Sequence, residues 1–200
     1  MRLAWTALIT LSFVLGSGIV LTAITPGASA GQGDPSAKAQ VVAAFEKLNS
    51  VPSYRMKSTT SEATAVIEIV RPDKRHFTAQ SPKGTVESIA VGKEIRTRYN
   101  MPGAPAGWRC TTASRSPETF FNMDKMKKDL TEVIRKPDTM IEGTPVHAYA
   151  DVAGRGTLYV AAATGLPRRL VVVNTQSGKT ATIDFSDFGA PITIMLPSCG

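Results

Sequence analysis

VIEIVRPDKRHFTAQ, residues 66–80, and ESIAVGKEIRTRYN, residues 87–100, are the stretches that decide the fold. Polar and apolar residues alternate in both stretches, and Arg-Pro-Asp, Ser-Pro-Lys-Gly and Gly-Lys interrupt the alternation. A period of two, broken by turn residues about every ten positions, predicts an antiparallel meander. The expected strands cover residues 54–60, 63–70, 74–80, 85–91 and 94–100.

A helix is predicted on each side of this meander. Asp34 and Pro35 have the chemistry of a helix start, and apolar residues then recur at helical spacing as far as Leu48. Ser116 and Pro117 open the second predicted helix, which ends at Arg135, Lys136 and Pro137. Its apolar stripe consists of Phe120, Met123, Met126, Leu130, Val133 and Ile134. Such a stripe is typical of core packing, and the alternative is a movable lid over an apolar cavity.

A second group of strands is predicted at residues 140–150, 156–162, 168–174, 180–185 and 192–196. The order helix, strands, helix, strands indicates a mostly β, α+β domain. No linker is long or biased enough to divide it, so we expect a single domain over residues 31–200. The hydrophobic content of 42% is that of a globular protein.

The first thirty residues have the pattern of an export signal. Arg2 is their only charged residue, an apolar run covers 3–24, and Ala28-Ser29-Ala30 is a small-residue cleavage site. We therefore expect residues 1–30 to be a signal peptide, cleaved before Gly31, and the protein to be periplasmic or secreted. The apolar run is also long enough to span a bilayer, so an uncleaved anchor is the alternative.

The chain has two cysteines, Cys110 and Cys199. In an oxidising compartment two lone cysteines usually pair, so we expect a disulfide between them. It would close a loop of about ninety residues. The alternative is a reactive thiol, although neither cysteine lies in a C-x-x-C motif.

Catalytic motifs are missing from the sequence. It contains no G-x-S-x-G, no phosphate-binding glycine loop and no H-x-x-x-H, and its two histidines, His76 and His147, lie within strand patterns. Asp184 and Asp187 are close in sequence, and we interpret them as a solvated turn rather than a metal site. We expect no catalytic residue, cofactor or metal. An enzyme would need a histidine beside a nucleophile in a pocket.

The positive charge is spread along the chain. There are 23 Lys and Arg against 16 Asp and Glu, and removal of Arg2 with the signal would lower the net charge from +7 to +6. Aromatic residues are few, so basic residues are not interleaved with stacking side chains as nucleic-acid binding requires. A basic surface suits an anionic membrane or an acidic partner better.

Several motifs occur in an order that resembles a known family. They are the Arg-Pro in residues 66–80, the Gly-Lys hairpin leading to Tyr99, and the segment TGLPRRLVVVNTQSGKTATIDFSDFGAPITIMLP at 164–197. The order is similar to that of the LolA and LolB superfamily of periplasmic lipoprotein carriers, closest to its lipid-carrying LppX and LprG branch. The resemblance implies an incompletely closed antiparallel β-barrel, a LolA-like half-barrel covered by helices around an apolar cavity. It also implies that Arg71, the matching arginine before proline, ties a helical lid closed, where its guanidinium could hydrogen-bond helix-end carbonyls.

These observations predict an exported, non-enzymatic carrier that holds a lipid or an acylated protein in an apolar cavity. The expected ligand-binding residues are Arg71, Phe77, Ile89, Trp108, Phe120, Met123, Met126 and Leu130. The alternative is an envelope sensor or interaction module of the same fold, which would bind a protein partner at a sheet edge or on the basic face. In either case we expect a monomer that contacts the membrane surface transiently.

Overall fold

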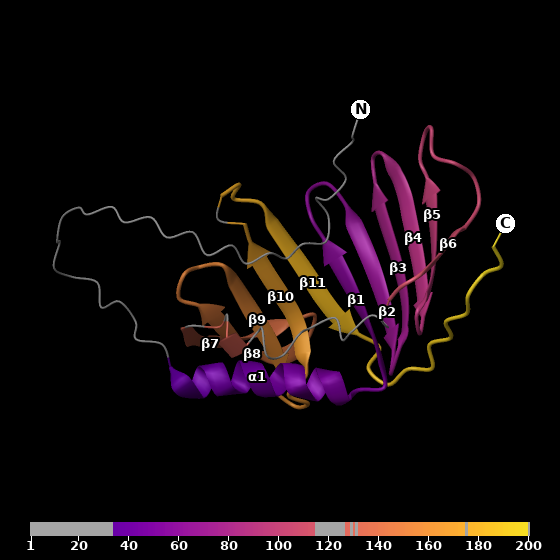
Figure 1. The fold of residues 1–200 in the computed structure, drawn as a ribbon. Helices are drawn as coiled ribbons and strands as arrows, with labels where there is room; N and C mark the ends of the chain where they lie inside the picture. The colour runs from indigo at the N-terminus through magenta and orange to yellow at the C-terminus, as the bar shows by residue number, and fades with distance from the viewer. Residues whose placement is uncertain (1–33, 115–126, 129, 131, 175, 200) are drawn as a thin grey trace. The chain divides into compact units, whose positions relative to one another are not determined.

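The computed structural model describes residues 34–114, 127, 128, 130, 132–174 and 176–199, all within one compact unit, Gly31–Gly200. A helix, α1 (Pro35–Ser50), precedes a sheet of eleven strands (Figure 1). The strands are β1 (Ser53–Thr59), β2 (Thr64–Val70), β3 (Lys74–Ser81), β4 (Gly84–Val91), β5 (Glu94–Asn100), β6 (Arg109–Thr112), β7 (Val133–Ile141), β8 (Thr144–Asp151), β9 (Gly156–Ala161), β10 (Pro167–Val173) and β11 (Thr180–Ser186). No described helix is long and apolar enough to cross a membrane.

Helix α1 begins as the sequence predicts. The Asp34 carboxylate accepts a hydrogen bond from the Ser36 amide at 2.8 Å, and Pro35 occupies the first turn. The Asp34 amide donates to the Val133 carbonyl at 2.8 Å, which places the start of the helix beside β7. The apolar stripe faces the sheet and is buried.

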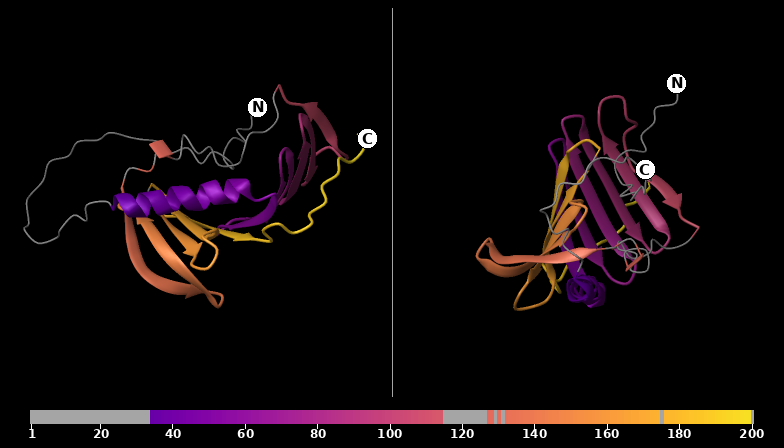
Figure 2. Two further views of the ribbon diagram at one scale, coloured as in Figure 1. Left: turned by 90° about the horizontal axis from the view of Figure 1, so that it is seen from below. Right: turned by 90° about the vertical axis from the view of Figure 1, so that its left-hand side faces the viewer.

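The sheet is antiparallel throughout and does not close. Its order is β6-β5-β4-β3-β2-β1-β11-β10-β9-β8-β7, so the chain starts in the middle, runs out to β6 and returns from β7 to β11 beside β1. The edge strands β6 and β7 are not paired with each other. Figure 2 shows the sheet curving around the side on which α1 lies. This is the predicted half-barrel.

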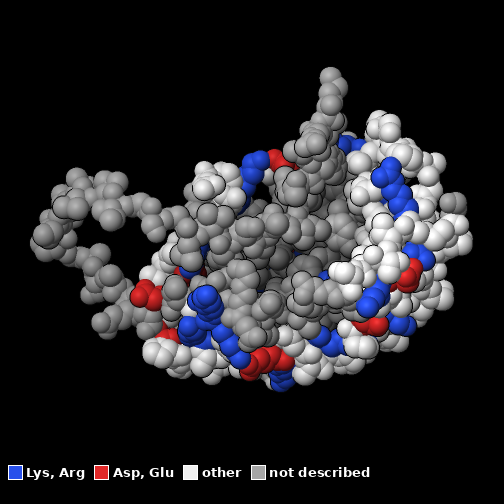
Figure 3. Space-filling model, in the orientation of Figure 1, with Lys and Arg blue, Asp and Glu red and all other residues white. Residues whose placement is uncertain are grey.

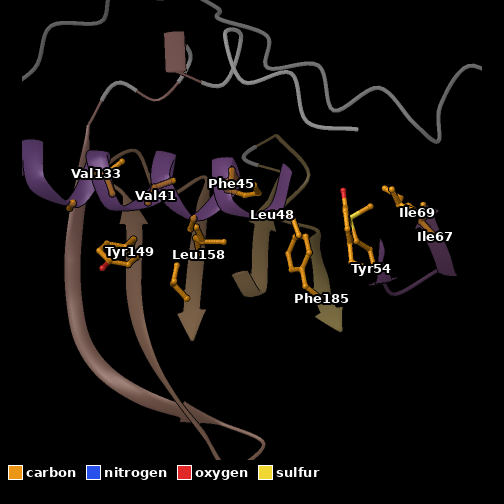
Figure 4. Packing of buried hydrophobic residues seen from close by; sticks show 14 residues of the cluster. Val41, Phe45, Leu48, Tyr54, Ile67, Ile69, Val133, Tyr149, Leu158 and Phe185 are labelled. Atoms are coloured by element: carbon orange, nitrogen blue, oxygen red, sulfur yellow. The ribbon is translucent and has the colours of Figure 1, made fainter. Parts of the chain in front are cut away.

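The core lies between α1 and the sheet. Phe45 of α1 and Phe185 of β11 meet edge to face, with ring centroids 6.5 Å apart. Phe185, Leu48 and Tyr54 are completely buried in this cluster (Figure 4). Edge-to-face packing adds about 0.5–1.5 kcal/mol to the burial of the two rings.

The prediction for the second helix is wrong at its C-terminal end. Residues 133–136 belong to β7, which is paired with β8. Val133 and Ile134 are β-branched and favour strands, and Pro137 is tolerated because β7 is an edge strand whose register shifts between Lys136 and Thr139. Most of the predicted helix, including Phe120, Met123 and Met126, lies outside the described residues, as does the predicted signal peptide, residues 1–30.

Two predicted strands differ from the structure. The expected strand 140–150 is confirmed over residues 144–150, which belong to β8, but it begins too early, because a turn at Glu142 and Gly143, where φ is 48° and 76°, separates β8 from the end of β7. Two consecutive residues with positive φ make the tight turn that suits the twist of a hairpin. Residues 192–196, which were expected to be a strand, form no strand in the structure. The segment begins near β11 and β1, and these two strands are already paired with each other, so neither offers it a free edge there.

Candidate ligand-binding face

Strand pairing divides the side chains of β1–β6 between two faces. Tyr54 is opposite Ile69, Ile69 is opposite Arg75, and Arg75 is opposite Ala90. Paired residues share a face and successive residues alternate. We call the side that carries Tyr54 and the core cluster the inner face, and the other side the outer face.

The inner face of β1–β5 contains no acidic residue. All three carboxylates of these strands, Glu68, Glu87 and Glu94, occupy outer-face positions in the register. The inner positions are apolar or small and uncharged apart from Arg75. Phe77 lies among them, partly buried and packed against the core cluster. Helix α1 packs on β7, β9 and β10, at the other end of the sheet.

Arg71 follows β2 and holds the end of α1. Its Nε donates to the Val51 carbonyl at 3.1 Å, and its Nη2 donates to the Asn49 side-chain oxygen at 2.9 Å. The last carbonyls of a helix lack partners within the helix, and a cation is favoured beside them. The helix end that Arg71 contacts is that of α1. Its implied role in closing a lid formed by the second predicted helix stays a prediction.

Tyr54 and Arg75 form an unusual pair on the inner face. Tyr54 is completely buried, and its hydroxyl has no hydrogen-bond partner among the described residues. Burial raises the pKa of Tyr54 to about 12, against the opposing influence of the nearby Arg71 and Arg75 charges. Burial also lowers the pKa of Arg75. Figure 4 shows Tyr54 between Phe185 and Ile69, beyond the end of α1.

The outer face carries a ladder of alternating charges. His76 has Nδ1 2.9 Å from Glu68 and Nε2 2.9 Å from Glu87. Arg55 donates to Glu68 at 2.6 Å, and Arg98 donates to Glu87 at 2.5 Å. These cross-strand pairs run from β1 to β5, so both carboxylates of the ladder are paired on their own face. Basic and acidic side chains are also interspersed on the side seen in Figure 3.

The structure brings together only some of the predicted binding residues. Phe77 and Leu130 both pack against the core cluster. Ile89 pairs with His76, which places it on the outer face, and Trp108 lies beneath the Arg98 guanidinium, 4.8 Å from its centre. Tyr54 and Arg75 were not among the residues predicted from the sequence. Arg75 lies two residues before Phe77 in an alternating strand, and this spacing was the signal that could have placed both on one face.

The predicted disulfide is present. Cys110 on β6 is bonded to Cys199, with Cα atoms 6.1 Å apart and a sequence separation of 89. The C-terminal segment 187–199, which we call the strap, therefore runs from β11 to β6 (Figures 1 and 2). It is anchored where the Gly189 amide donates to the Ser53 carbonyl at 2.8 Å. Ile194 of the strap is buried.

A cavity of about 450 Å³ lies at the other end of the sheet, against β7–β10. Its lining residues are Ile134, Lys136, Ala150, Asp151, Val152, Gly154, Gly156, Thr157, Val171 and Val173. Neither the predicted binding residues nor the two histidines line it. Asp184 and Asp187 pair separately with Arg169 and Arg55, and the described residues contain no cluster of metal ligands.

No protein-family model matches the sequence, and no curated protein matches it. LprF from Mycobacterium bovis superposes with a TM-score of 0.61 at 14% identity, covering 85% of this chain and 100% of LprF. The lipoprotein LppX from Mycobacterium tuberculosis gives a TM-score of 0.57 at 10% identity, covering 81% and 100%.

This chain has the fold of LprF and LppX. The resemblance inferred from the sequence motifs is thereby confirmed for the fold, including its LppX-like branch. Both structures are covered over their whole length.

Proposed function

We propose that residues 31–200 form an exported, non-enzymatic binding protein that holds the acyl chains of a lipid or of an acylated protein against the inner face of the sheet. The observation that carries the proposal is the acid-free inner face of β1–β5, which continues beyond the strands covered by α1. Removing each CH₂ group from water contributes about 0.8 kcal/mol, so acyl chains need no covalent attachment. The fold shared with LprF and LppX supports the same function.

The two sheet edges favour a carrier over a module that docks a protein strand. Edge β6 has only four residues, and Cys199 is bonded to it. Edge β7 contains Pro137 and a register shift, and Arg135 and Lys136 stand beside them. Short edges, prolines, bulges and charges are the features that prevent strand addition. In the alternative function, a protein partner would therefore have to bind basic residues on the surface rather than a sheet edge.

The test is native mass spectrometry of the purified protein, together with titration of a fluorescent acyl probe. Phe77→Glu places a charge on the inner face and should weaken probe binding at least tenfold. Gln80→Glu makes a similar change at an exposed outer-face position of the same strand and should bind as the wild type does. Circular dichroism of both variants controls for folding. A wild-type protein that carries no lipid and binds no acyl probe contradicts the proposal.

A further inference from the structure

Arg75 is the only charged residue on the inner face of β1–β5, and it has no counterion in the part of the chain that the structure describes. It forms no hydrogen bond or ion pair with any described residue, although most arginines on the outer face are paired. Placing a cation on an apolar face without a partner is costly. An unpaired arginine in this position needs a partner that the described chain does not supply.

The Tyr54 hydroxyl supplies a second donor beside Arg75. Tyr54 and Arg75 lie in one row across β1, β2 and β3, with Ile69 between them. The hydroxyl is buried and meets no hydrogen-bond criterion with a described residue. Arg71, by charge and by proximity to the hydroxyl, and then Arg75, by charge, lie close enough to lower its pKa against the effect of burial. A buried donor without an acceptor loses its hydration and gains nothing in return. Two donors without an acceptor among the described residues therefore lie in one row on the inner face.

The polar groups in this row point to an anion. Arg71 lies nearby, but the end of α1 already occupies its Nε and Nη2. The carboxylates of these strands are on the opposite face, so no acidic side chain in β1–β5 competes for Arg75. A guanidinium and a phenol present several N–H and O–H donors, which match the oxygens of a carboxylate or a phosphate.

We propose that Arg75 and the Tyr54 hydroxyl bind the anionic headgroup oxygens, carboxylate or phosphate, of a ligand whose acyl chains lie along the inner face beside Phe77. The inference rests on the proposed function and narrows its ligand class to anionic amphiphiles. Phe77 is two residues beyond Arg75 on β3 and on the same face, so the row of donors borders an apolar surface. Hydrogen bonds to an ionised group are the stronger kind, and an apolar site strengthens them further.

The test compares a fluorescent long-chain fatty acid with its uncharged methyl ester. The wild type should bind the acid about tenfold more tightly than the ester, which is the scale of one hydrogen bond to a charged group. Arg75→Gln should remove that preference and leave the affinity for the ester unchanged. Tyr54→Phe should reduce the preference by a smaller factor. Lys57→Gln, the same loss of charge at an exposed outer-face position, should behave as the wild type does.

The outcomes separate this inference from the proposed function. Failure of both acid and ester to bind the wild type overturns the proposed function. Equal binding of acid and ester, or a preference that survives in Arg75→Gln, overturns the headgroup site while acyl binding stands. Inorganic phosphate is the third probe. If phosphate alone displaces the acid and this ability is lost in Arg75→Gln, the site binds free anions and the headgroup assignment is wrong.

Discussion

The disulfide gives the sharpest prediction about stability. Replacing Cys110 and Cys199 together with alanine removes the cross-link without leaving a free thiol. With the cysteines separated by 89 positions in sequence, the chain-entropy relation gives a loss of about 4.5 kcal/mol in the free energy of unfolding at 25 °C. A domain of this size has a stability of about 5–15 kcal/mol, so the variant would lose a large share of it.

The structure also predicts where the cross-linked protein and the variant differ in the native state. The anchor of the strap at Ser53 does not depend on the disulfide, because its hydrogen bonds join Ser53 to Gly189 and Ala190. Ile194, 5% exposed, lies closer to the lost bond and should become more accessible in the variant. We therefore expect faster hydrogen exchange in the strap beyond residue 190 in the variant than in the wild type. The amides of α1 and β11 should show the same relative protection from exchange in both proteins.

The assay is urea unfolding of the oxidised wild type and the double variant, followed by circular dichroism. The midpoint should fall, and the dependence on urea should rise because the unlinked chain exposes more surface when unfolded. A loss below about 1 kcal/mol would refute the argument, because it would mean that the loop is already constrained in the unfolded chain. The wild type treated with a reducing agent controls for the substitutions and should match the variant.

Two further predictions concern charged groups. Arg71→Ala removes the two hydrogen bonds to the end of α1 and should cost about 1–3 kcal/mol in urea unfolding, whereas Lys74→Ala should change stability by less than about 0.5 kcal/mol. Burial acts to raise the pKa of Glu68 and Glu87, but hydrogen bonds from arginine and His76 outweigh it, so the pKa of each lies below its ordinary value. Their contribution to stability is therefore complete above about pH 4.3 and is lost as the pH falls through the lower folded-state pKa. Unfolding between pH 6 and pH 3 should show a steeper loss in the wild type than in the Glu68→Gln, Glu87→Gln double variant, and equal slopes would contradict the ladder.

Local patterns predicted the elements whose stability depends on nearby sequence. The capping of α1 by Asp34 and the alternation in β2–β5 were readable because each depends on neighbouring residues. The hairpin turn at Glu142 was not predicted, because a non-glycine residue there adopts positive φ and its side chain gives no sign of this conformation in the sequence. The strand expected at 192–196 has the right alternation, but a strand also needs a free edge, and the topology decides which edges are free.

The binding face shows the same division between local and global information. Phe77 and Ile89 are both apolar residues in alternating strands, and the sequence offered no reason to separate them. In the register, Phe77 pairs with Ser88, so Ile89 is displaced by one residue and lies on the opposite face. A shift of one position moves a side chain across the sheet. The predicted residues Phe120, Met123 and Met126 lie outside the described residues and stay a prediction.

Once the face of Tyr54 is known, the pairing of six strands fixes the face of every residue between Ser53 and Thr112 that lies in a strand. Acidic and basic residues are mixed along the sequence of these strands, and the net charge does not predict which residues lie on which face of the sheet. The fold separates them: the acidic residues lie on the outer face, where arginine side chains and the His76 ring form hydrogen bonds with Glu68 and Glu87, and Arg75 is the one charged residue on the inner face. A sheet stabilised only by its core would gain from an apolar residue at position 75. The arginine there is best explained by a charge that arrives with the ligand, which is why Arg75→Gln is expected to leave the affinity for the ester intact and to remove the preference for the acid.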